Sequence, residues 1–159
     1  MTEQDKMNGL IDKVHQWGVD RKIIGNGKLE TQWLKLLSEF GEMCDTLAKG
    51  GDPIDDIGDQ LVVLIMMAGI SQKVEMVKQL MPYAPPRWRS TINAVRRLCI
   101  GYEWLLFGFL DSAVAACLGA LRAVASNHNL TLLQCLQHAY DEIKDRKGYL
   151  NEQGVFIKE

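Results

Sequence analysis

The stretch Lys35–Leu64, KLLSEFGEMCDTLAKGGDPIDDIGDQLVVL, decides the fold expected for this chain. Before its Gly-Gly-Asp-Pro turn, apolar residues recur with the spacing of one helix face. After the turn, the run that begins at Leu61 is apolar on every side, which is typical of a helix in the middle of a bundle. Helices joined by so short a turn pack antiparallel, so we expect a helical hairpin at the centre of the molecule.

Each helix of this hairpin carries a pair of carboxylates with the same spacing, Glu39 with Glu42 and Asp56 with Asp59. Two intervening residues place both members of a pair on one helix face, about one turn apart. Antiparallel packing brings the pairs together, and acids at the edge of a core repel one another unless a cation lies among them. Oxygen-only ligands favour Mg²⁺, with Mn²⁺ as the other candidate.

Each acid also has an ordinary structural explanation. A lone pair of glutamates at this spacing is most often a solvated helix face. Asp52 is expected to cap the second helix with Pro53 at its first position, and the helix dipole favours Asp55 and Asp56 in the first turn. Asp59 is harder to explain this way, because it directly precedes the apolar run and needs a partner or a metal.

The rest of the chain is also expected to be helical, because alternating β-branched runs with hairpin signals are absent. We therefore predict an all-α fold, a helical bundle formed by one domain over residues 1–159. Thr2 with Asp5, and Thr131 with Gln134, have the pattern of helix N-caps. The first three helices are expected over residues 3–17, 29–49 and 53–70. A rigid connector is expected over residues 81–86. Further helix is expected from Ser90 to about Ser126, with a break near Gly108–Asp111, and from Thr131 to Gly148.

Composition limits the classes of function. A chain of 159 residues, 47% of them hydrophobic, can bury one compact core. Its net charge of −2 provides no broad basic field, so nucleic acid is not an expected partner, and we interpret the arginines of 87–97 as an exposed loop beside a helix. The runs Leu61–Ile70 and Leu98–Leu110 are too short for a membrane span. Without CxxC pairs or an apolar leader, we expect a cytoplasmic protein lacking disulfides.

The opening stretch resembles the core of the MazG-like, all-α nucleoside triphosphate pyrophosphohydrolases, whose pattern is ExxE followed after a short spacer by ExxD. Glu39, Glu42 and Asp59 match this pattern, and Asp56 stands where the family usually has Glu. The ending AYDEIKDRKG and the terminal GVFIKE also resemble small members of the family. Together these segments cover less than a third of the chain. Residues from about 72 to 118 are additional helical material that compact members lack.

The resemblance implies hydrolysis of a (d)NTP between its α- and β-phosphates, which gives a monophosphate and pyrophosphate. It implies Mg²⁺ held by Glu39, Glu42, Asp56 and Asp59, with the shorter Asp56 able to draw Asp55 into the ligand set. Either Glu39 or Glu42 would serve as general base. It also implies a homo-oligomer, a dimer or tetramer, because a second chain usually completes the bundle in this family.

Three basic residues are candidate contacts for the phosphates. Lys35 lies one turn before Glu39, and a salt bridge between them is the equal alternative. Lys144 and Arg146 match the family's KxRxG ending, although favourable charge at a helix C-terminus explains them as well. The rival from another class is a non-catalytic helical interaction protein that keeps the scaffold and uses the acids for packing or metal-dependent stability.

The aromatic and histidine residues carry weaker signals. Trp17 and Trp33 are expected in the core, with the wall of a base pocket as the alternative. His15, His128 and His138 form no metal-binding motif and are expected at the surface or as filler. The sequence contains no phosphate-binding glycine loop, so nucleotide binding would depend on the metal.

Overall fold

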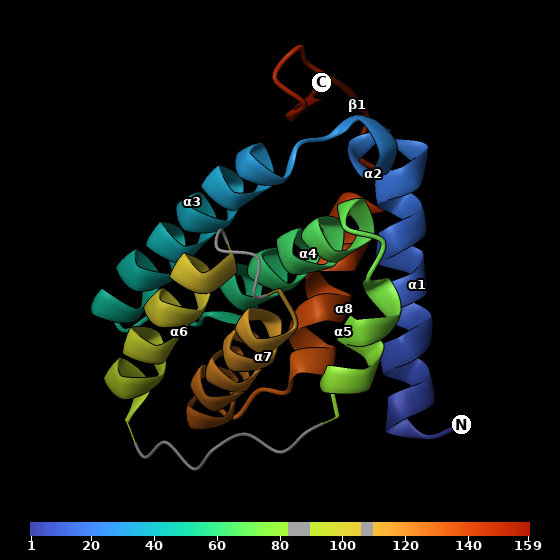
Figure 1. Ribbon diagram of the computed structural model, residues 1–159. Helices are drawn as coiled ribbons and strands as arrows, with labels where there is room; N and C mark the ends of the chain where they lie inside the picture. Colours follow the sequence, from blue (N-terminus) through green and yellow to red (C-terminus); the bar gives the residue numbers. More distant parts are fainter. Residues whose placement is uncertain (83–89, 106–109) are drawn as a thin grey trace.

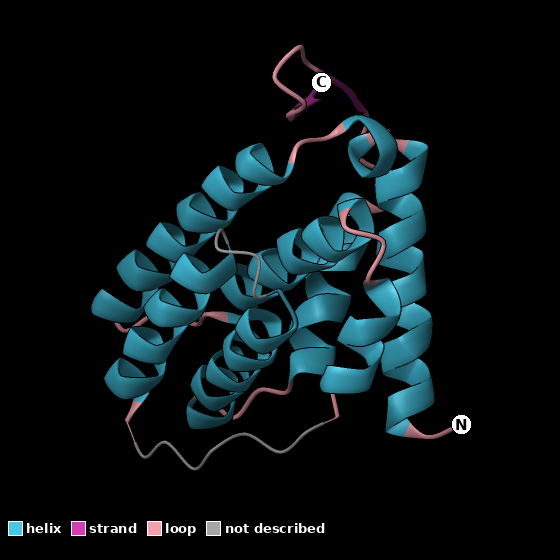
Figure 2. Ribbon diagram, in the orientation of Figure 1, coloured by secondary structure: helices cyan, strands magenta, loops and turns pink. Residues whose placement is uncertain are grey.

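The computed structural model describes residues 1–82, 90–105 and 110–159, which form a helical fold with a small hairpin at the end (Figure 1; Figure 2). The all-α prediction is confirmed, and no helix of this part of the chain is long and apolar enough to cross a membrane. The helices are α1 (Glu3–Asp20), α2 (Ile23–Asn26), α3 (Leu29–Ala48), α4 (Ile54–Ile70), α5 (Val74–Leu80), α6 (Thr91–Leu105), α7 (Leu110–Asn127) and α8 (Leu132–Ile143). Strands β1 (Gly148–Leu150) and β2 (Phe156–Lys158) pair antiparallel, with Tyr149 opposite Ile157.

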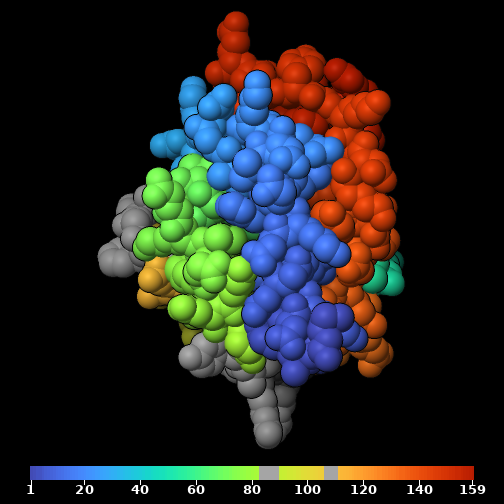
Figure 3. Space-filling model, turned by 90° about the vertical axis from the view of Figure 1, so that its right-hand side faces the viewer, coloured from blue at the N-terminus to red at the C-terminus, as the bar shows by residue number. Residues whose placement is uncertain are grey.

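Helix α4 lies at the centre of the fold, as its sequence predicts. Every residue from Gln60 to Gly69 is buried. Helices α1, α3, α5, α7 and α8 all contact α4, and Figure 1 shows them arranged around it. On the face of the molecule seen in Figure 3, α1 runs between α5 and the C-terminal part of the chain. Since each buried aliphatic side chain contributes roughly 1.5–3 kcal/mol, α4 is a major source of folding free energy.

Helices α4 and α8 approach each other closely at Gly58. A Cβ atom added at this position would clash with the carbonyl oxygen of Cys135 and lie 2.8 Å from the Cβ atom of Ala139. The missing side chain therefore lets the first half of α4, which carries Asp56 and Asp59, lie directly against α8.

Two predicted helix starts are confirmed. The Thr2 side chain accepts a hydrogen bond from the backbone N–H of Asp5, and Thr131 accepts one from that of Gln134. In return, the Asp5 side chain accepts a hydrogen bond from the backbone N–H of Thr2, and the Gln134 side chain accepts one from that of Thr131, which completes both capping boxes. Helix α1 continues to Asp20, one turn beyond its expected end.

Two predicted boundaries were wrong. Pro53, not Asp52, occupies the N-cap of α4, and the Asp52 carboxylate accepts a hydrogen bond from the N–H of Ile54 over 3.1 Å. Helix α8 ends at Ile143, and Gly148 begins strand β1 instead of ending the helix. A Cβ atom at Gly148 would clash with the carbonyl oxygen of Ile157, so strand pairing requires the glycine.

In its described residues, the segment from about 72 to 118 is mostly helical, as predicted, and comprises α5, α6 and the first half of α7. Helices α6 and α7 form a pair in which α6 contacts α3 and α7 contacts α4 (Figure 1). Most of the predicted connector, the arginines at 87 and 89, and part of the predicted break fall on residues 83–89 and 106–109, outside the described residues.

Candidate functional site

A cavity of about 370 Å³ lies between α1, α3, α4 and the C-terminal segment. Most of the predicted site residues line it, and Asp56 and Lys144 do not. The predicted residues in its wall are Lys35, Glu39, Glu42, Asp59 and Arg146. The structure thus brings together carboxylates from two consecutive helices and cations from α3 and from the segment after α8.

Glu39 is buried at this cavity and is paired with Lys35. The Glu39 side chain is 5% exposed, and Lys35 Nζ contacts its Oε1 atom from the solvent side, where the lysine is 51% exposed. The salt bridge between Lys35 and Glu39, predicted as the alternative to a phosphate contact, is therefore present. It supplies a charge partner for a carboxylate that is otherwise costly to bury.

Asp59 has a strongly perturbed titration. Burial raises the pKa of its carboxyl to about 7, and the negative charges of Glu39 and Asp55 add to the shift. Lys35 and Arg146 lower the pKa in part. A neutral solution therefore contains comparable amounts of the protonated and ionised forms of Asp59. The contribution of Glu39 to this shift indicates that carboxylates of α3 and α4 lie close enough to repel one another.

Asp56 is 9% exposed but does not line the cavity. Burial raises the pKa of its carboxyl, a hydrogen bond with Thr46 of α3 lowers it in part, and the charges of Asp55 and Glu39 raise it further. Its side chain is thus engaged with α3, beside the other acids. Of the four predicted carboxylate ligands, Asp56, where this chain departs from the MazG-like pattern, is the one outside the cavity wall.

Asp55 pairs with helix α8. The His138 Nε2 atom lies 3.5 Å from Asp55 Oδ1 and 3.7 Å from Glu142 Oε1, and each of the three side chains is 40–51% exposed. Among the described residues, this trio alone places three potential metal-ligating atoms within 4.8 Å of one another. The four predicted carboxylates do not converge this closely. Contacts between exposed side chains, which are ion pairs only when His138 is protonated, explain the trio, and His138 is at the surface as expected.

Arg146 and Lys144 have different surroundings. Lys144 Nζ pairs with Asp141 Oδ1 over 2.8 Å at the C-terminal end of α8. Arg146 lines the cavity and helps to lower the pKa of Asp59. Arg21 holds this segment by donating hydrogen bonds to the Arg146 carbonyl oxygen over 2.8 and 3.0 Å and to that of Lys144 over 3.2 Å. No local pattern in the sequence marks Arg21 for this role.

Trp17 lies in the core, as expected, and its side chain also lines the cavity. It is 8% exposed, and its Nε1 atom donates a hydrogen bond to the Ile143 carbonyl oxygen over 2.8 Å. Phe156 packs edge-on against its ring, with centroids 5.6 Å apart, and Arg21 lies over the ring at 4.8 Å. Trp33 is partly buried against the core, outside the cavity wall.

The C-terminal hairpin was missed, although it contributes Phe156 and Lys158 to the cavity wall. Its turn is stabilised by the Asn151 side chain, which accepts hydrogen bonds from the N–H groups of Gln153 and Val155 over 3.0 and 2.9 Å. Gly154 has a φ of +78°, a conformation that favours glycine. An Asn and a Gly flanked by β-forming residues are the signal that would have indicated this hairpin.

Comparison with known proteins identifies one short region of similarity. The chain is 38% identical over 61 residues to an uncharacterized 18.2 kDa protein in the rep–hol intergenic region of Haemophilus phage HP1 (strain HP1c1). The match covers 37% of this chain and 37% of the length of that phage protein. No family profile matches the chain, and no solved structure matches it significantly.

Proposed function

We propose that this protein is a metal-dependent pyrophosphohydrolase of nucleoside triphosphates. The observation that supports it is the shared cavity of Glu39, Glu42 and Asp59, bordered by cations and by the ring of Trp17. Carboxylates suit a hard divalent cation, cations suit a polyphosphate, and an aromatic ring suits a base. The resemblance of residues 35–64 to the MazG-like enzymes points to the same reaction.

The donor atoms fit Mg²⁺ or Mn²⁺. Glu39, Glu42 and Asp59 offer only oxygen atoms, and Asp56 lies close enough for the charge of Glu39 to affect its pKa. These four residues would hold the ion. When bound, it would neutralise the triphosphate and lower the pKa of a water molecule. A cation here would also relieve the repulsion that contributes to the raised pKa of Asp59.

The remaining side chains supply binding and proton transfer. Lys35 would exchange its partner Glu39 for a phosphate oxygen, while Arg146 and Lys158 would neutralise the other phosphates. Glu42 is better placed than Glu39 to accept a proton from the attacking water, because Glu39 is buried and paired with Lys35. Within the described residues, no cation pairs with the exposed Glu42.

The rival proposal is a non-catalytic helical interaction protein. It is favoured by the Lys35–Glu39 salt bridge, which neutralises one acid without a metal, and by the separation of the predicted ligand atoms. In that case the carboxylates would serve packing or metal-dependent stability, and the protein would not hydrolyse nucleotides with or without Mg²⁺.

The products formed from nucleoside triphosphates distinguish the pyrophosphohydrolase from the non-catalytic protein. We would incubate the protein with a panel of NTPs and dNTPs and Mg²⁺, and separate the products by ion-exchange chromatography. The pyrophosphohydrolase proposal requires nucleoside monophosphate and pyrophosphate as primary products. Diphosphate and orthophosphate would contradict it even if the acids bind metal. A folded protein with no turnover and no Mg²⁺ effect on stability would favour the rival. Sedimentation of the same sample would test the dimer or tetramer that the resemblance implies.

A further inference from the structure

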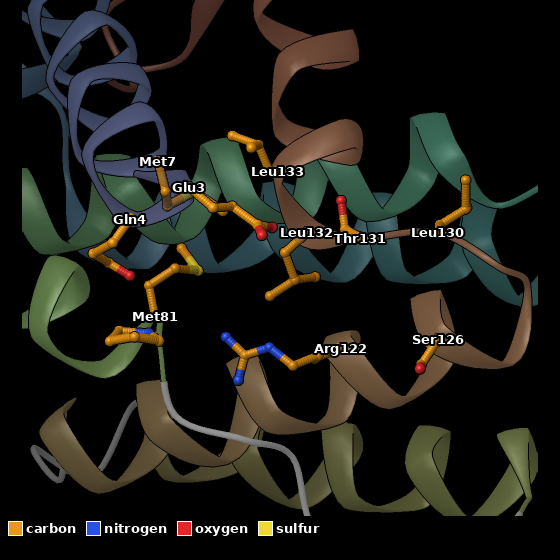
Figure 4. A pocket seen from close by; sticks show the side chains of 11 residues that line it. Glu3, Gln4, Met7, Met81, Arg122, Ser126, Leu130, Thr131, Leu132 and Leu133 are labelled. Atoms are coloured by element: carbon orange, nitrogen blue, oxygen red, sulfur yellow. The ribbon is translucent and has the colours of Figure 1, made fainter. Parts of the chain in front are cut away.

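A second cavity lies at the opposite end of α1 from the carboxylates. Its volume is about 420 Å³, and its wall is formed by the first turns of α1, the residues after α5, the second half of α7 and the start of α8 (Figure 4). Met7, Met81 and Leu132 make its floor apolar, and all three are buried. Glu3 stands in its wall on the solvent side, where the helix begins.

Arg122 of α7 extends into this cavity toward Met81 (Figure 4). The side chain is only partly exposed, and burial lowers the pKa of its guanidinium. Among the described residues, nothing forms a hydrogen bond or an ion pair with it. Residues 83–89 and 106–109 contain no aspartate or glutamate, so their side chains supply no carboxylate partner either.

A partly desolvated guanidinium without a counterion costs free energy that a bound anion would recover. A carboxylate can accept two parallel hydrogen bonds from one guanidinium. Among the described residues that line this cavity, Arg122 is the single cation, which matches an anion with one charge, and the negative Glu3 disfavours a phosphate dianion. The apolar floor provides space for a hydrocarbon body.

We propose that this cavity binds a small organic monocarboxylate, with its carboxylate on Arg122 and its apolar body against Met7, Met81 and Leu132. This site shares no residue with the carboxylate cavity. The proposal therefore stands independently of the proposed hydrolase activity.

Octanoate is a suitable probe, because it combines one carboxylate with a flexible apolar chain. Isothermal titration of the full-length protein is expected to show saturable binding of octanoate and weaker binding of inorganic phosphate. Arg122→Gln should weaken octanoate binding at least tenfold. Arg96→Gln, which removes an exposed arginine of α6 outside the cavity, should leave it unchanged. Glu3→Gln should bind octanoate at least as tightly as the natural protein, because it removes a negative charge from the wall.

Thermal unfolding without ligand distinguishes this role from a structural one. Arg122→Gln is expected to unfold at the same or a higher temperature, because it removes an unpaired and partly buried charge. A lower melting temperature with unchanged octanoate affinity would assign Arg122 to packing. Absence of saturable octanoate binding to the folded natural protein, or preferential binding of phosphate, would overturn the proposal.

Discussion

The hydroxyl of Tyr102 in α6 donates a hydrogen bond to the side-chain oxygen of Gln60 in α4 over 2.5 Å, and both residues are fully buried. Burial raises the pKa of the Tyr102 hydroxyl, so it remains a donor. The Gln60 amide in turn donates to the backbone carbonyl oxygen of Asp56 over 2.9 Å. Helix α6 is thereby tied to the turn of α4 that carries Asp56 and Asp59.

Tyr102→Phe should lower the free energy of unfolding by about 1–3 kcal/mol, because the Gln60 oxygen stays buried without a donor. Urea denaturation followed by circular dichroism measures this loss. Tyr149→Phe is the matched control, since Tyr149 is 57% exposed and its loss should be within about 0.5 kcal/mol. Equal losses in both variants would show that the buried hydrogen bond contributes nothing.

Glu42→Gln and Asp59→Asn should each abolish nucleotide hydrolysis while the helical content stays unchanged, because the amides keep the shape of the side chain and lose its charge. Product formation under saturating Mg²⁺ measures the effect. Asp45→Asn removes an exposed acid of the same helical hairpin and should retain full activity. If both site variants hydrolyse nucleotide like the natural protein, these carboxylates are not the catalytic centre.

Asp59 makes the stability of the metal-free protein depend on pH. Its folded pKa of about 7 lies above the ordinary value of 3.8, so the folded state binds more protons than the unfolded state between these values. The stability from Asp59 is fully present below the ordinary pKa and is lost as the pH rises through the folded pKa. In the presence of a chelator, the melting temperature should therefore fall more steeply from pH 5 to pH 8 than in Asp59→Asn. Parallel curves for the two proteins would contradict the raised pKa.

Lys35→Met should destabilise the metal-free protein by about 1 kcal/mol, because Glu39 loses its cation while the exposure of the lysine limits the effect. Added Mg²⁺ should raise the melting temperature of this variant more than that of the natural protein, since no ammonium group competes for Glu39. Lys49→Met breaks the exposed pair with Asp45 and should change neither the stability of the metal-free protein nor its stabilisation by Mg²⁺. If Mg²⁺ stabilises Lys35→Met no more than the natural protein, the ion does not bind at Glu39.

Two glycines provide a matched test of helix packing. Gly58→Ala should lower stability by about 1–3 kcal/mol, because its Cβ atom would be forced against Cys135 and Ala139 of α8. Gly41→Ala in α3 meets no atom of the described residues within 4 Å and should raise stability by up to about 1 kcal/mol through helix propensity. Chemical denaturation of both variants measures the difference, and a stabilised Gly58→Ala would mean that α4 and α8 can move apart.

The helices and several of their boundaries could be predicted because their signals are local. The apolar spacing of α3, the apolar run of α4 and the capping boxes at Thr2 and Thr131 each lie within a few residues of the structure that they specify. The same holds for the short turn between α3 and α4, which brings Glu39, Glu42 and Asp59 to one cavity. The C-terminal hairpin was not predicted, because its strands have only three residues each and their alternating pattern is too short to recognise.

The sequence by itself determined the all-helical fold and the spacing of the acidic pairs, because both depend on the 3.6-residue repeat of the helix. Only the tertiary structure decided that Asp56 engages α3, that Asp55 pairs with His138, and that Arg21 holds the segment carrying Arg146. It also decided that Arg122 enters a cavity in which no described residue pairs with it. These relationships join residues from separate helices, and the partner and burial of each charge depend on how the helices pack, which no local pattern encodes.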